Sequence, residues 1–195
     1  MGHYVDASFG VIAGMADNER QVMFAEGEYF PPERINANII WYSSGFIAYS
    51  FSNMFSKKNK IKELTSTLEI CSETFNYQND WKSDITFSIN NQDLVTYLSP
   101  GDLGGQRVLL NPSWWPNNAT QFGILIKLTI TEIGGFLNGV LSNTKVNLST
   151  LEIYKDHRLT LTIQNKSVAV HIGGFNIFGK HFGDYEQDIL LTAIY

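Results

Sequence analysis

Apolar and polar residues alternate along several short segments of this chain. The segments 85–89, 124–130 and 159–164 each place an aliphatic or aromatic side chain at every second position, with Thr, Ser, Lys or Gln at many of the positions between. A period of two is typical of strands that have one buried and one solvated face. No long stretch shows the period of an amphipathic helix. The pattern therefore predicts a chain made of short β-strands.

Turn residues separate these strands at short intervals. Ser43-Ser44-Gly45 divides the apolar segments 39–42 and 46–51, and Asn90-Asn91-Gln92 divides 85–89 from 94–98. Each interruption is typical of an antiparallel hairpin. Many short strands without strand–helix alternation predict an all-β, antiparallel β-sandwich, jelly-roll-like, with at most short helical turns.

The length of 195 residues is most simply that of one domain with a sizeable core. We expect this domain to span residues 8–195. Residues 1–7, which begin Met1-Gly2-His3, are predicted to be the remnant of an expression tag or a disordered N-terminus.

Charge argues against nucleic acid and membranes as direct partners. The net charge is −5, and the one basic run, Lys57-Lys58-Asn59-Lys60, is typical of a solvated turn. Phosphate neutralisation requires a basic surface that this chain lacks, and an acidic chain is repelled by anionic lipid. The first thirty residues have five acidic side chains and no apolar core, so no signal peptide is predicted.

Cysteine and histidine usage points to a cytoplasmic protein without a metal or cofactor. Cys71 is the single cysteine, so an intramolecular disulfide is excluded and a reducing compartment is favoured. The four histidines show no zinc-type spacing. No Gly-x-Ser-x-Gly motif or convincing catalytic triad is present. We therefore expect no catalysis.

Three of the four tryptophans fall in turn-rich loops between residues 77 and 123. Exposed faces of Trp81, Trp114 and Trp115 would stack on a sugar ring, and the amide of Gln121 would bind its hydroxyl groups. Alternatively, tryptophan fills the core, since it is mostly buried in proteins. For Trp114 and Trp115 we favour one buried and one exposed ring.

Carboxylates and glycines accompany these aromatic residues. Asp80 and Asp84 could act as a glycosidase acid and base, or they could cap turns through backbone amides. The loop 99–107 contains three glycines that would allow close approach to a ligand, with Asp102 and Arg107 supplying hydrogen bonds. Alternatively, this loop is only a wide connection between two strands. The glycine-rich segment 173–188 is interpreted as a structural turn, because its acidic residues do not match an EF-hand.

Several segments, taken together and in this order, resemble the C-terminal domain of a group of bacterial ArsR-type winged-helix regulators. The matching segments are Pro32-Glu33-Arg34-Ile35-Asn36-Ala37, Ile40-Trp41-Tyr42, Gly45-Phe46, Leu68-Glu69-Ile70-Cys71-Ser72-Glu73, Asn79-Asp80-Trp81, Ser83-Asp84-Ile85-Thr86, Ser99-Pro100-Gly101-Asp102, Pro112-Ser113-Trp114-Trp115-Pro116, Thr120-Gln121-Phe122-Gly123, Gly173-Gly174-Phe175-Asn176-Ile177-Phe178-Gly179 and Gly183-Asp184-Tyr185-Glu186-Gln187-Asp188-Ile189. The resemblance extends over most of the chain from about residue 8.

The resemblance implies a non-catalytic regulatory domain that relays ligand occupancy to a winged-helix DNA-binding part that this sequence lacks. The expected partner is a small polar ligand, with a carbohydrate as the favoured class, and a homodimer is expected because such regulators read pseudo-palindromic DNA. The predicted ligand-binding residues are Asp80, Trp81, Asp84, Asp102, Arg107, Trp114, Trp115 and Gln121. Two alternatives remain, a glycoside-cleaving jelly roll with paired carboxylates and a ligand-free dimerisation module.

Overall fold

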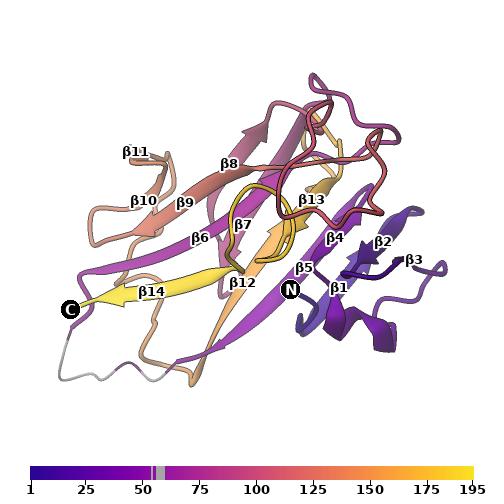
Figure 1. Cartoon of the computed structure of the whole chain (residues 1–195). Coiled ribbons are helices and arrows are strands. Elements are labelled where there is room, and N and C mark those ends of the chain that lie inside the picture. Colours follow the sequence, from indigo (N-terminus) through magenta and orange to yellow (C-terminus); the bar gives the residue numbers. More distant parts are fainter. Residues whose placement is uncertain (54, 56–59) are drawn as a thin grey trace.

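The computed structural model describes residues 1–53, 55 and 60–195, and the first three residues of the basic run 57–60 lie outside this part. The chain forms two antiparallel sheets that pack face to face, which confirms the predicted all-β sandwich (Figure 1). The five-stranded sheet has the order β1 (Asp6–Phe9), β5 (Gly45–Ser52), β12 (Arg158–Gln164), β7 (Ser83–Ile89) and β8 (Gln92–Ser99). The nine-stranded sheet has the order β11 (Val140–Leu141), β10 (Gly135–Leu137), β9 (Ile124–Ile130), β6 (Glu63–Cys71), β13 (Phe175–Phe178), β4 (Ile39–Tyr42), β2 (Ala13–Ala16) and β3 (Gln21–Met23), with β14 (Leu190–Ile194) also paired to β6.

The main core lies between the two sheets. The alternating residues of β7 and β12 point into it, as their period of two predicts, and Phe87 and Ile163 have no exposed surface. From the opposite sheet, Tyr42 of β4 packs edge-on against Phe175 of β13, with ring centroids 4.1 Å apart. Burial of such side chains, at about 25 cal/mol per Å² of apolar surface, supplies the main driving force for folding.

One of the two predicted hairpins forms and the other does not. β7 and β8 pair through Asn90 and Asn91, which both have positive φ, as a tight hairpin turn requires. β4 and β5 do not pair, so the prediction of a hairpin at Ser43-Ser44-Gly45 is wrong. The chain crosses there from one sheet to the other, because β4 already has β2 and β13 as its two neighbours.

The outer face of the nine-stranded sheet, turned away from the main core, carries a second apolar cluster. Its buried residues are Ala16, Ile39, Trp41, Cys71, Trp115, Phe178 and Phe182. Loop residues 103–122 and 179–188 cover this face, and Figure 1 shows the first of these loops beside β13 and β4. Because β4 is covered on both sides, all four of its residues are buried, which explains its uninterrupted apolar sequence.

A buried carboxylate on β6 holds both covering loops. Glu69 has no exposed surface, and its side chain accepts hydrogen bonds from the backbone N–H groups of Gly123, Asp184 and Tyr185 at 2.7–3.1 Å. Gly183 adopts φ +83°, and a Cβ there would lie 2.4 Å from the Glu69 carboxylate. The tight turn predicted for residues 173–188 therefore closes around this one side chain.

The N-terminal residues pack against the rest of the domain. Tyr4 is buried in the main core, and its hydroxyl donates to the carbonyl oxygen of Tyr29. The Val5 N–H donates to Ala48, and β1 pairs with β5 from Asp6 onward. Residues within the segment 1–7 therefore join the fold, and one aromatic side chain among them contributes to the core.

Helical structure is confined, in the part of the chain that the structure describes, to the 3-10 helix η1 (Pro32–Asn36). The described residues include no helix with the length and apolar character needed to cross a bilayer. Pro31 precedes η1 and Pro32 opens it, in keeping with the tolerance of the first helical turn for proline.

Replacing Glu69 with Ala should destabilise the protein by about 3–5 kcal/mol, because three backbone N–H groups, that of Gly123 buried and those of Asp184 and Tyr185 partly buried, would lose their acceptor. Urea unfolding followed by tryptophan fluorescence measures this loss. Glu63→Ala is the matched control on the same strand. Glu63 forms a partly exposed ion pair with Lys127 at 3.5 Å, so its loss should cost at most about 1 kcal/mol. Equal effects of the two substitutions would contradict the role assigned to Glu69.

Candidate functional site

A groove of about 580 Å³ opens at one end of the nine-stranded sheet. At this end β4 and β6 finish and β2 and β13 begin, as the register of Tyr42 with both Ala13 and Phe175 requires. The groove is lined by Ile12, Gln21, Met23, Trp41, Ser43, Glu73, Thr74, Phe75, Asn76, Trp81, Trp115, Pro116, Asn118, Ala119, Thr120, Ile172, Gly173 and Asn176. Its size is that of a small-molecule site.

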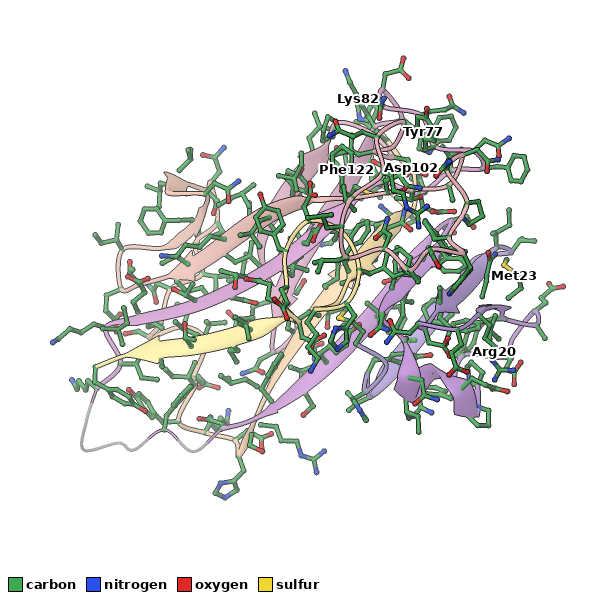
Figure 2. All side chains as sticks on the ribbon, in the orientation of Figure 1. Arg20, Met23, Tyr77, Lys82, Asp102 and Phe122 are labelled. Carbon is green, nitrogen blue, oxygen red and sulfur yellow. The ribbon has the colours of Figure 1, made fainter. Side chains whose placement is uncertain are left out.

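Aromatic rings form much of the groove. Trp41 and Trp115 are nearly buried, with ring centroids 5.9 Å apart, and Trp115 donates from Nε1 to the Thr120 carbonyl oxygen. Trp81 and Phe75 are exposed, to 41% and 83%. The groove thus joins two fixed indole rings with two rings that a ligand could cover. Met23, labelled in Figure 2, adds a flexible apolar side chain from β3.

Polar groups lie among these rings. Asn176 faces both Trp41 and Cys71 across the strand register. Its side-chain amide donates to the backbone oxygen of Ser72 at 2.6 Å and to Oε2 of Glu73 at 2.7 Å. Glu73 is partly accessible from the groove, although protein atoms crowd it, and the described residues give its Oε1 atom no hydrogen bond. One carboxylate oxygen is therefore free to bind a ligand.

A second carboxylate, that of Asp102, is buried close to Glu73. Its Oδ2 atom accepts the Thr74 N–H at 2.9 Å. Its Oδ1 atom has no hydrogen bond of normal geometry to any described residue, although the Thr120 hydroxyl lies close enough to lower the pKa. Burial raises the pKa of Asp102 to about 6. Burial, and then the nearby Asp102 charge, raise the pKa of Glu73 to about 8, against the lowering effect of Asn176.

Three of the predicted site residues lie in or beside the groove. Trp81 and Trp115 line it, with the exposed ring at Trp81 and the buried one at Trp115. Asp102 has no exposed surface, so it cannot contact a ligand directly. Figure 2 shows Asp102 near Tyr77 and Lys82 at this end of the sandwich.

The other predicted site residues do not line the groove, because backbone groups occupy most of their side chains. Oδ2 of Asp84 accepts the N–H groups of Val170 and His171, both at 3.0 Å, which is a turn-capping role. Gln121 is fully buried, and its side chain binds Pro116, Ala119 and Asn111. Asp80 lies exposed in a turn.

Arg107 and Trp114 stabilise the loop that covers the outer face. The guanidinium group of Arg107 donates to the carbonyl oxygen of Trp115 at 3.0 Å, within the same loop. Trp114 packs edge-on against Trp115, with centroids 5.6 Å apart, and donates from Nε1 to the Asn18 carbonyl oxygen at 2.6 Å. These contacts fix the loop in place and leave neither residue on the groove wall.

The glycines of the loop 99–107 approach protein atoms. A Cβ at Gly104 would lie 2.4 Å from the ring of Tyr77, and the Gly104 N–H donates to the Asn79 side chain at 3.0 Å. An isolated bridge between Gln78 and Asp102 completes this contact. The glycines of the loop 99–107 thus pack against the protein and not against a ligand. The loop is a wide connection that follows β8, and it supports the segment 72–81.

Sequence reasoning missed Glu73, Asn176 and Trp41 as groove residues. A local signal existed only for Glu73, which continues the alternation of β6 at positions 69, 71 and 73. Asn176 lies between apolar neighbours in β13, and in a strand an isolated amide of this kind is easily taken for a residue that faces solvent.

Neither the side chains of the groove nor a comparison of the chain with known proteins assigns an activity to the site. Within the described ranges, no three His, Cys, Asp or Glu side chains converge so that they could hold a metal ion. Burial raises the pKa of the Cys71 thiol well above its usual value, so this thiol is not activated as a nucleophile. No protein-family model, curated protein or solved structure matches the chain.

The raised pKa of Glu73 should make the protein less stable as the pH rises. The folded state holds this proton more tightly than the unfolded chain does, so the stabilisation is complete below the ordinary value of 4.5 and is lost as the pH approaches about 8. We expect a loss on the order of 2 kcal/mol between about pH 5 and about pH 8.

Thermal unfolding of the wild type and of Glu73→Gln across this range tests the expectation. The variant should lose much of the pH dependence, while Asp102 leaves a smaller decline of the same sign at lower pH. Glu26→Gln, an exposed carboxylate outside the groove, is the control and should keep the wild-type profile. A variant as pH-sensitive as the wild type would contradict the assignment.

Proposed function

We propose that this chain is a non-catalytic ligand-binding domain whose groove takes a small polar molecule with an apolar face, with carbohydrates as the favoured class. The observation that carries the proposal is the groove itself, where Trp81 and Phe75 offer exposed ring faces beside the free Oε1 of Glu73. Concave sites that combine aromatic walls with a few convergent polar groups are typical of small-molecule binding.

The arrangement favours binding over the two alternatives. A glycosidase needs two carboxylates facing each other across an open groove. Asp84 instead caps a turn, and Asp102 is fully buried. A purely structural module would bury its aromatic cluster completely, whereas Trp81 and Phe75 remain exposed beside a cavity of about 580 Å³.

We further propose that the domain is the regulatory half of a winged-helix regulator and relays groove occupancy to the DNA-binding half. Support comes from the segments that resemble ArsR-type regulators, which include Trp81, Trp115 and the groove residues Glu73 and Asn176. The net charge of −5 fits a domain that leaves DNA contact to another part of the protein. A homodimer, and a cytoplasmic location, belong to the same proposal.

A thermal-shift screen against mono- and disaccharides, sugar phosphates and common metabolites tests ligand binding. A ligand at one hundred times its dissociation constant should add about 2.7 kcal/mol and raise the melting temperature by a few degrees. The result that overturns the proposal is a melting temperature that no compound in the panel changes.

Substitution of Trp81 locates the binding site. Trp81→Ala should weaken binding of any hit by on the order of 1–3 kcal/mol, because a stacked aromatic anchor is lost. Trp114→Ala is the matched control, since Trp114 belongs to the covering loop and does not line the groove. It should lower stability and leave affinity unchanged. If affinity followed Trp114 and ignored Trp81, binding would lie elsewhere.

A further inference from the structure

The groove has an acidic residue without a basic one. Glu73 is the one charged residue among those that line it, and the described lining includes no Lys, Arg or His. None of the ion pairs between described residues involves Glu73 or Asp102. Most acidic groups at buried positions have a cationic partner or several N–H donors, because an isolated buried charge is costly.

The carboxylates of Glu73 and Asp102 accept fewer hydrogen bonds than the carboxylate of Glu69 does. Glu69 accepts three backbone N–H groups, whereas Glu73 accepts one side-chain amide and Asp102 one backbone N–H. The fully buried Oδ1 of Asp102 has no partner of normal geometry among the described residues. A positively charged group placed at the free Oε1 of Glu73 would relieve the repulsion between the two carboxylates.

The aromatic residues suit the same kind of group. Trp41, Trp81, Trp115 and Phe75 line the groove together with Glu73. A cation over the face of an indole ring is attracted by the ring quadrupole, and desolvation strengthens this attraction. Aromatic cages are a common means by which proteins recognise quaternary ammonium groups, and Glu73 would add an ionic contact.

We infer that the groove selects ligands that carry a positively charged nitrogen, which binds Oε1 of Glu73 while the rest of the ligand packs on Trp81 and Trp115. This inference rests on the proposed function and narrows its ligand to ammonium compounds, among them amino sugars. It assigns Glu73 as the residue that determines specificity, with Asp102 acting through it. Anionic ligands such as sugar phosphates find no Lys, Arg or His in the described lining to bind them.

Binding of a cation is linked to the proton on Glu73. The titratable groups that act on Glu73 and its surroundings are Asp102, whose charge raises the pKa of Glu73, and the buried Cys71 thiol behind them. Because the pKa of Glu73 is about 8, the cation must displace a proton at neutral pH. The affinity for a permanent cation therefore rises with pH, and binding releases a proton.

The test compares choline, a permanent cation, with 3,3-dimethylbutan-1-ol, its neutral isostere. Titrations followed by the tryptophan indole N–H resonances measure both affinities in the wild type, in Glu73→Gln and in the control Glu26→Gln. We expect choline to bind roughly tenfold or more tightly than the isostere near pH 8.5. Glu73→Gln should bring the two affinities to about the same value, and Glu26→Gln should not.

The pH series on the wild-type protein keeps the test independent of how the variant folds. Choline affinity should increase by roughly tenfold between about pH 6 and about pH 8.5, and isostere affinity should stay nearly constant. Equal binding of the two probes, or tighter binding of neutral sugars that Trp81→Ala abolishes, would overturn the selectivity and leave the proposed binding function standing. Failure of choline to perturb any indole resonance would also overturn the inference, whereas silence of every neutral and charged probe would overturn the binding function itself.

Discussion

The hydrogen bonds of the Glu69 carboxylate are the interaction on which the functional end of this molecule depends. Two loops, far apart in sequence, meet on one buried side chain through the N–H groups of Gly123, Asp184 and Tyr185. Their closure buries Trp115 and Phe182 over the outer face of the sheet. Without it the loop that includes Trp115, and that forms one wall of the groove, would depend on its remaining anchors at Arg107, Asn111 and Trp114.

Glu69 and Glu73 show how position along one strand divides structural from functional carboxylates. They lie four residues apart at outward positions of β6 and its extension, and burial raises the pKa of both. Glu69 lies where the loops close, so their backbone amides satisfy it. Glu73 lies beyond the strand end, where the covering ends and a single amide, that of Asn176, reaches it. The incomplete cover is what creates the groove.

Period-two alternation was enough to predict the fold class and several strands, β7, β9 and β12 among them, because each turns its apolar residues toward the main core. It could not predict the partners of β4, which depend on contacts with β2 and β13 across the whole chain. For the site, the aromatic loops drew attention to Trp81 and Trp115, which line the groove, and their binding of a ligand stays a prediction. For Asp84 the turn-capping alternative describes its contacts, whereas the structural roles of Arg107 and Gln121 depend on backbone groups that only the folded loops present.

Asp102 connects the groove to the loop framework. It bridges to Gln78 and accepts the Thr74 N–H, and its charge raises the pKa of Glu73, so it acts on both the segment 72–81 and the ionisable group that a ligand meets. Under the proposed function, a cation that ionises Glu73 also changes the electrostatic cost of the Asp102 charge, and with it the hydrogen bonds that hold the 72–81 segment. Occupancy is then converted into a change in loop stability, which is the kind of change that an attached domain can sense.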